Sequence, residues 1–288
     1  MTFDTNTAIR LLTMISLGGL LFTVGLRLTW DEVVASLRRC HLGWLVPANF
    51  VVPPVLALAL ARLFHIPTDI AIGMLLLAAA PFAPVVPIFT RMAKGDLALA
   101  GALTALFPFF SALLTPLVCE AGLKILVGNG SLNFSVWTVL VVLVSTITLP
   151  LTAGVLFSHW LPVAGRKILK PLEVVSEAAG AVSLAFVTFV EFREILATGW
   201  KPLLAMALGS EILLISGYAF SGPAPAVRRV VALGTSNRNI ALALLVALES
   251  FPGTPVVAAV VANGLLLIFL GLLHVAFWHF RPYHRSHD

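Results

Sequence analysis

Charged residues are scarce in this chain. They make up only 11% of its 288 residues, whereas hydrophobic residues make up 59% and the mean hydropathy is +1.02. Because soluble proteins carry about 25% charged residues, the composition excludes a soluble domain and predicts a polytopic membrane protein. At about 20 residues per spanning helix, the length allows roughly nine or ten spans in a single transmembrane domain, 1–288, with no separate extramembrane enzyme.

Cysteine is also rare, and the basic residues form no compact stripe. Cys40 and Cys119 lie far apart without a second ligand cluster, so neither a disulfide nor a metal site is indicated. The net charge of +5 comes from basic residues scattered through the loops, which argues against a nucleic-acid partner. The apolar run 11–26 is followed by Arg27 and lacks a small-residue cleavage site, so we expect a first span there instead of a signal peptide.

Long apolar runs, in contrast, are abundant. Their boundaries predict nine spans. The spans lie near residues 8–27, 43–64, 67–92, 97–119, 134–160, 171–191, 201–221, 226–249 and 255–279. Most basic residues, such as Arg39, Arg281 and Arg285, lie at or beyond the ends of odd-numbered spans, which predicts an external N-terminus and a cytoplasmic C-terminus. The short loops and the lack of a targeting segment favour a bacterial inner membrane.

Two spans contain residues that interrupt a helix. In the third, Pro81, Pro84 and Pro87 each remove a backbone donor and clash with the preceding turn, so we expect a break at mid-depth. In the eighth, five consecutive polar residues favour an unwound segment because their side chains compete for backbone hydrogen bonds. These five are Thr235, Ser236, Asn237, Arg238 and Asn239. Two interrupted spans at corresponding places predict a transporter binding site.

The third and eighth spans stand at equivalent positions if the chain divides after its fourth span. Each broken span is then second from the end of its half. Being five spans apart, the two would cross the membrane in opposite directions, as an inverted repeat requires. The predicted fold class is therefore an all-α polytopic membrane protein with about nine transmembrane helices, inverted repeats and two broken, crossing helices.

Arg238 is the residue that most constrains function. A charge at membrane depth costs roughly 2.5–3.5 kcal/mol on insertion scales, so it usually faces a cavity, a ligand or a buried partner. Glu211, near the middle of the seventh span, and Glu177 are the available anionic partners, and a proton-coupling role is the alternative for Glu211. Thr104 and Thr115 lie near one helical face, a pattern that usually serves helix packing.

Five stretches together match the pattern of one transporter family. They are 22–32 (FTVGLRLTWDE), 48–54 (ANFVVPP), 91–99 (RMAKGDLAL), 113–116 (LLTP) and 234–244 (GTSNRNIALAL). In these stretches the chain resembles the bile acid:sodium symporter family, a group of secondary transporters. The resemblance implies a core domain, near 43–119 and 201–279, in which the two broken helices cross near the midplane. It also implies a panel domain that moves against the core, formed by the spans near 8–27, 134–160 and 171–191.

The chain departs from the sodium-coupled members at the positions that bind sodium. It has Ala232 where they carry a glutamate, and 82–87 (FAPVVP) where they carry Gly-Gly-Thr-Ala-Ser-Asn. Hard cations take oxygen ligands, and these side chains supply none. A second sodium site would keep Asn49, Ser236 and Asn237 as side-chain ligands. Sodium is thus the only cofactor that the resemblance implies, and the sequence leaves coupling to it open.

Taken together, these patterns predict a secondary transporter that moves a small organic anion across the lipid bilayer by alternating access. Two roles are open for Arg238: its guanidinium replaces bound sodium, or it binds a substrate carboxylate or sulfonate through two hydrogen bonds. The expected substrate- or ion-binding residues are Asn49, Pro81, Pro84, Pro87, Thr235, Ser236, Asn237, Arg238 and Asn239.

Other functions remain to be weighed against this prediction. A sodium-independent exporter or uniporter is the main alternative, and Ala232 favours it. An intramembrane enzyme would need a nucleophile with its base or metal ligands at helical spacing, and the sequence has neither H-E-x-x-H nor G-x-S-x-G. A receptor would not explain two broken spans. The sequence predicts neither the substrate nor the oligomeric state.

Overall fold

The regular structure of the described chain is entirely helical. The computed structural model describes residues 5–28, 38, 42–128 and 134–280, so Cys40, Arg39, Arg281 and Arg285 lie outside the described residues. Six long helices are unbroken: α1 (Thr5–Arg27), α3 (Leu42–Leu63), α6 (Leu97–Val127), α9 (Pro162–Val190), α11 (Trp200–Ala219) and α14 (Pro255–Phe280). With Val136–Trp160 and Pro225–Ser250, eight helical stretches are long and apolar enough to cross a membrane. The protein is therefore an integral, multi-pass membrane protein.

The stretch Val136–Trp160 contains an irregular turn. It comprises α7 (Val136–Leu143), a five-residue π-helix (Val144–Thr148) and α8 (Leu149–Trp160). Pro150 is the second residue after the π-helix and lies at the start of α8. Because proline removes a donor and clashes with the preceding turn, the wider π turn lets the helix continue with little interruption.

The third predicted span is broken, as its prolines indicated. It consists of α4 (Thr68–Ala78) and α5 (Val86–Met92), and residues 79–85 between them are not helical. The eighth predicted span is also broken, into α12 (Pro225–Ser236) and α13 (Ile240–Ser250). At 1.5 Å per residue, an eleven-residue helix such as α4 extends about 16 Å, roughly half of a hydrocarbon core. The broken spans therefore place helix ends at mid-depth.

The other predicted spans agree with the observed helices except at a few boundaries. Helix α9 begins at Pro162 instead of residue 171, because its basic first turns continue the helix beyond the apolar run. Helix α6 extends to Val127, eight residues past the predicted end at 119. A short helix, α10 (Phe192–Ala197), joins α9 to α11.

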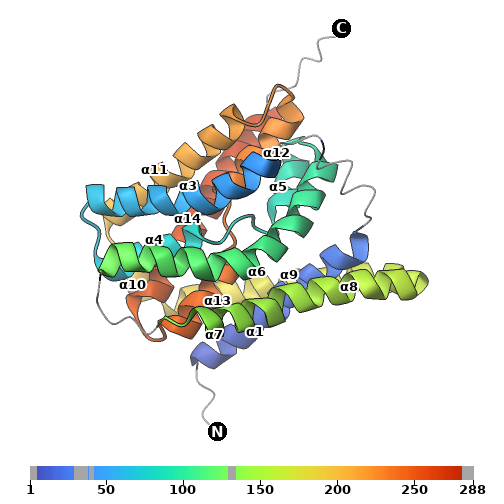
Figure 1. Cartoon of the computed structure of the whole chain (residues 1–288), viewed down its shortest axis with the longest axis horizontal. Coiled ribbons are helices and arrows are strands. Elements are labelled where there is room, and N and C mark those ends of the chain that lie inside the picture. Colours follow the sequence, from blue (N-terminus) through green and yellow to red (C-terminus); the bar gives the residue numbers. More distant parts are fainter. Residues whose placement is uncertain (1–4, 29–37, 39–41, 129–133, 281–288) are drawn as a thin grey trace.

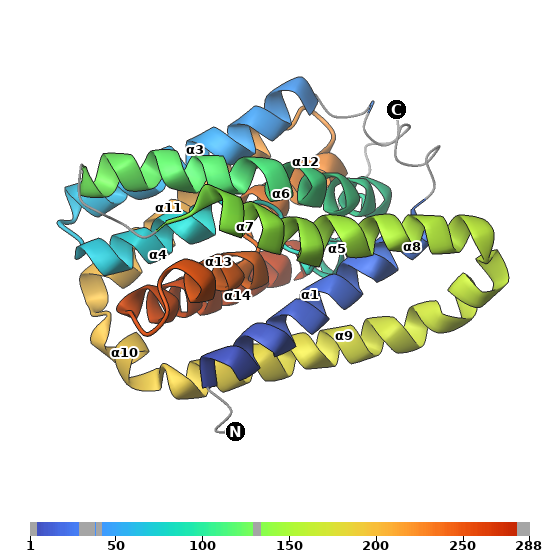
Figure 2. The same ribbon diagram turned by 60° about the horizontal axis from the view of Figure 1, so that its bottom comes forward.

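Helix α1 packs closely along α8 and α9 (Figure 2). Gly25 of α1 meets Gly154 of α8 at backbone contact: a Cβ atom on Gly154 would lie 2.2 Å from the carbonyl oxygen of Phe22. Towards α9, the Ser16 hydroxyl donates to the carbonyl of Ser176 at 2.9 Å. Small and hydroxyl-bearing residues of this kind hold membrane helices together by close approach and interhelical hydrogen bonds.

The remaining helices form the larger part of the molecule. Helices α4, α13 and α14 pack together in its interior, and α3, α6, α11 and α12 surround them. In both ribbon views α3 lies on the side opposite to α1 and α9 (Figures 1 and 2). The crossing of the two broken spans therefore has one side towards α1 and α9 and another towards α3.

We expect the Gly25–Gly154 contact to tolerate no side chain. Gly154→Ala should lower the free energy of unfolding by about 1–3 kcal/mol, because the new methyl group must push the two backbones apart. Gly101→Ala is the matched control, since nothing lies within 4 Å of a Cβ atom at Gly101. Thermal unfolding of the purified variants measures both effects, and an equal loss in Gly101→Ala would contradict the interpretation.

Candidate functional site

The two unwound segments bind each other through their backbones. The amide of Ala83 donates to the carbonyl of Asn237 at 3.1 Å, and the amide of Asn239 donates to the carbonyl of Ala80 at 2.8 Å. Unpaired backbone groups are costly at membrane depth, so this exchange stabilises both interruptions. The segments 79–85 and 237–239 thereby form a fixed crossing.

Most predicted polar side chains close the helix ends at this crossing. Asn237 Nδ2 donates to the carbonyl of Leu233 at 3.0 Å, which helps to terminate α12. Asn239 Oδ1 accepts from the amide of Leu242 at 3.1 Å and is the N-cap of α13. From α6, the Thr115 hydroxyl donates to the carbonyl of Ala79 at 2.8 Å. Thr115, a residue whose spacing favoured a role in helix packing, thus satisfies the unwound backbone.

Arg238 lies at the centre of the crossing and is only 3% exposed. Its Nη1 atom donates to Asn49 Oδ1 at 3.1 Å and to the carbonyl of Thr235 at 3.5 Å. Its Nη2 atom donates to the carbonyl of Asn49 at 2.9 Å and to that of Ala78. The Nε atom has no partner among the described residues. The guanidinium thus joins α3 to the C-terminal ends of α4 and α12.

The expected anionic partners do not pair with Arg238. Glu211 extends from α11 towards α14. Its two carboxylate oxygens therefore lie 3.0 and 2.9 Å from His274 Nε2. Glu177 is exposed on α9. Within the described residues, the partners of Arg238 are uncharged oxygens, so the expected ion pair is replaced by hydrogen bonds to the partly negative ends of helices.

A cavity of about 230 Å³ separates this crossing from α1 and α9. Its walls include Ser16 and Leu20 of α1, Gly180 of α9, Pro84, and the segment 237–241. Of the predicted site residues, Pro84, Asn237, Arg238 and Asn239 therefore lie together at one cavity. Ser16 and Gly180 were missed because no local pattern marks them: their place in the wall depends on how distant helices pack.

A larger cavity of about 370 Å³ continues along α1. Val24, one helical turn beyond Leu20, lines it together with Arg27 of α1 and Arg91 of α5. The other wall includes Pro87, Gly101 and Thr104. The Thr104 hydroxyl is buried and has no hydrogen-bond partner among the described residues. In the opposite direction, a smaller cavity of about 120 Å³ extends past Ser16 between α1, α9 and α13. The three cavities form a row along α1, which we call the α1 cavity row.

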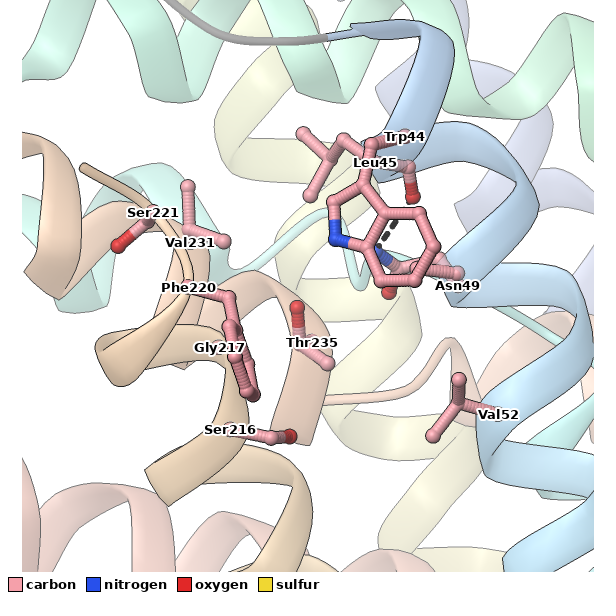
Figure 3. A pocket seen from close by; sticks show the side chains of 11 residues that line it. Trp44, Leu45, Asn49, Val52, Ser216, Gly217, Phe220, Ser221, Val231 and Thr235 are labelled. Atoms are coloured by element: carbon pink, nitrogen blue, oxygen red, sulfur yellow. Dashed lines mark hydrogen bonds between the residues drawn. The ribbon is translucent and has the colours of Figure 1, made fainter.

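Another cavity of about 150 Å³ approaches the crossing from the α3 side (Figure 3). Asn49 and Thr235 lie at its inner end, whereas Trp44 and Phe220 are 59% and 75% exposed near its outer end. Ser236 instead lines a small cavity between α3, α4 and α11 with Arg238 and Asn263, and Pro81 is buried. The predicted site residues therefore divide between the two sides of the crossing.

The crossing offers few free oxygen ligands for a metal ion. Asn49 Oδ1, named above as a sodium ligand, already accepts from Arg238. Ser236 Oγ donates to the carbonyl of Leu233 at 3.4 Å and accepts from Asn237 Nδ2 at 3.3 Å. A cation at Asn49 Oδ1 would have to displace the guanidinium, and Ser236 Oγ is already engaged, so these two predicted ligands do not fit a bound sodium ion.

We expect Asn49 to stabilise the buried charge directly. Asn49→Leu should lower the free energy of unfolding by about 1.5–3 kcal/mol, the usual value of a hydrogen bond to a charged group. The control is Asn263→Leu, because Asn263 is also buried but makes no side-chain hydrogen bond with the described residues. Denaturation of both variants in detergent measures the difference, and equal losses would remove the special role of Asn49.

Comparison with known proteins supports the resemblance seen in the sequence. Residues 14–199 match the model of the sodium bile acid symporter family. The Bacillus subtilis protein named "Uncharacterized sodium-dependent transporter YocS" is 28% identical over 168 residues, which are 56% of this chain and 49% of that protein. The Arabidopsis thaliana "Probable sodium/metabolite cotransporter BASS1, chloroplastic" is 24% identical over 252 residues, 85% of this chain and 61% of that protein.

A rice relative extends the similarity over nearly the whole chain. The Oryza sativa "Probable sodium/metabolite cotransporter BASS2, chloroplastic" is 24% identical over 278 residues, 93% of this chain and 64% of that protein. The chain thus spans between about half and two thirds of the length of these relatives. The family model covers more than half of the chain, and its broken, crossing spans agree with the transporter pattern. The chain belongs to the sodium bile acid symporter family.

Proposed function

We propose that this protein is a secondary transporter that carries a small organic anion across the membrane by alternating access. The carrying observation is the α1 cavity row, in which one cavity is lined by Arg238 at the crossing and the next by Arg27 and Arg91. Its largest cavity, about 370 Å³, falls within the range of roughly 300–1,000 Å³ that is usual for small-molecule sites. The names of the relatives, a sodium-dependent transporter and sodium/metabolite cotransporters, support transport of a small molecule.

The charges along the row favour an anion. None of the described residues that line its two larger cavities is acidic, and three of them are arginines. Arg27 is paired with Glu173 at 2.7 Å, so Arg91 supplies most of the net positive charge of the 370 Å³ cavity. A cleft lined by one sign of charge concentrates ligands of the opposite sign. At the crossing, the Nε–H of Arg238 is buried and has no hydrogen-bond partner among the described residues.

The packing supports a division into two moving parts. Helices α1, α7, α8 and α9 would form the panel, in which the Gly25–Gly154 contact and the Ser16 hydrogen bond join neighbouring helices. The broken spans with α3, α6, α11 and α14 would form the core. Because the α1 cavity row follows the boundary, movement of the panel along the core would open one end while closing the other.

The orientation follows from the basic residues. We place the end with Arg27, Arg91 and Lys94 in the cytoplasm, and the N-terminus outside, by the positive-inside rule. The 370 Å³ cavity would then receive or release the anion on the cytoplasmic side of a bacterial inner membrane. The direction of transport, import or export, depends on the concentration gradients of the substrate and of any coupled ion.

Filling the 370 Å³ cavity tests this function. Carboxylates, sulfonates and their neutral amides are first screened for thermal stabilisation of the purified protein, since a ligand that binds only the folded state raises its stability. Hits are then measured as radiolabelled uptake into proteoliposomes. Gly101→Phe should abolish uptake without lowering the unfolding temperature, because its side chain points into open space.

Gly43→Phe is the control for that substitution. Gly43 also has open space at its Cβ position and lies at the start of α3, away from the α1 cavity row. It should transport normally. Normal uptake by Gly101→Phe, or stabilisation by the neutral amides alone, would contradict the proposal.

Arg91 should determine the apparent affinity for the anion. Arg91→Gln should raise the KM for uptake by about fivefold, equivalent to ~1 kcal/mol for a solvent-exposed charge, and leave the maximal rate almost unchanged. Arg91→Lys keeps the charge and should stay near the wild-type KM. Initial rates at increasing anion concentration give both constants; an unchanged KM in Arg91→Gln would place the anion elsewhere.

A further inference from the structure

We infer that the guanidinium of Arg238 is a resident cation that takes the place of a bound sodium ion, so that transport by this protein needs no sodium. The transport part rests on the function proposed above. The cation part rests only on the geometry of the crossing. It separates this chain from relatives whose names include sodium.

The ends of the half-helices at the crossing are where a transporter of this kind would bind a cation. Helix carbonyl ends carry partial negative charge, and in transporters with broken helices such ends and the unwound carbonyls coordinate the coupling ion. Here the carbonyl of Ala78, at the end of α4, and that of Thr235, near the end of α12, both accept from Arg238. Asn49 contributes its side-chain and backbone oxygens.

The guanidinium uses this oxygen set almost completely. Its two Nη atoms carry four hydrogens, and they make four hydrogen bonds to protein oxygens. No carboxylate neutralises Arg238 within the described part of the chain. A sodium ion at these oxygens would both compete for the ligands and be repelled by a positive charge that cannot diffuse away.

Side chains without oxygen line one part of the crossing. The ring of Phe82 lies against Gly234, where a Cβ atom would be 2.0 Å from the ring, and stacks on Phe107 with ring centroids 4.7 Å apart. Phe82 adopts a positive φ of 57°, a conformation that a bulky residue rarely adopts. Ala232 is fully buried. Hydrocarbon therefore fills this part of the crossing.

A fixed cation changes the transport cycle. Bound sodium enters and leaves, so its gradient can drive a substrate, whereas the Arg238 charge stays in the protein throughout. The crossing then has the same charge in the outward- and inward-open states. The anion would move down its own gradient, or in exchange for another anion, which corresponds to the sodium-independent alternative considered above.

The test compares cations at equal ionic strength. Thermal unfolding of wild type, Arg238→Ala and Arg228→Ala is measured in sodium, potassium and choline chloride. Arg228 is the control because it is only half-buried and donates to the backbone carbonyl of Gly222, away from the crossing. We expect no sodium-specific shift in wild type or Arg228→Ala. Arg238→Ala frees the oxygens and should gain a sodium-specific rise of at least about 2 °C.

Two results would overturn the inference. One is a sodium-specific rise in wild type, and the other is a folded Arg238→Ala protein that remains indifferent to sodium. If Arg238→Ala does not fold in any salt, Arg238→Gln is judged by the same criteria. Binding of radiolabelled sodium to wild type decides the first point without any variant: saturable binding overturns the inference and its absence supports it.

Uptake in proteoliposomes separates this inference from the proposed function. Equal anion uptake with and without a sodium gradient supports both. Uptake that requires sodium overturns the inference and leaves anion transport standing. If no anion is transported under any gradient, the proposed function fails, while the unfolding temperatures still report whether Arg238 occupies the cation position.

Discussion

The architecture depends on burying one positive charge at the depth of the membrane. Arg238 is almost fully enclosed, and a cation in that position is tolerated only when surrounding groups replace its hydration. Two broken spans and one intact helix supply those groups, because the ends of α4 and α12 and Asn49 of α3 all direct oxygens at the guanidinium. The helix interruptions and the charge therefore stabilise each other: broken helices expose carbonyls that need donors, and the arginine provides them.

This mutual dependence gives the polar run 235–239 two roles, one in holding the crossing together and one in lining a cavity. The sequence alone could not separate these roles. Asn237, Asn239 and most of the guanidinium are engaged in holding the crossing together, while the same residues line the cavity next to α1. A transporter needs a site that is polar yet firmly shaped, since mobile polar groups would lose the geometry that distinguishes one anion from another. Using the cavity-lining residues as structural ties satisfies both needs with few polar atoms.

Features with a local backbone cause could be predicted from the sequence. The breaks at 79–85 and at 237–239 follow from missing donors and from side-chain competition within a few residues. Features that depend on helix rotation could not. Glu211 was a candidate partner for Arg238, but the direction of α11 turns it towards His274. Ser16 and Gly180 resemble ordinary packing residues until α1 and α9 are placed against the crossing.

Three consecutive carbonyls, beginning with that of the last residue of α4, accept hydrogen bonds from three different parts of the structure. Those of Ala78, Ala79 and Ala80 accept from Arg238, from Thr115 of α6 and from the backbone of Asn239. Any displacement of α6 relative to the crossing would have to break at least one of these bonds in a medium that offers no replacement donor. The crossing and α6 are therefore tied together as one unit, and in the alternating-access cycle proposed above they would move as one.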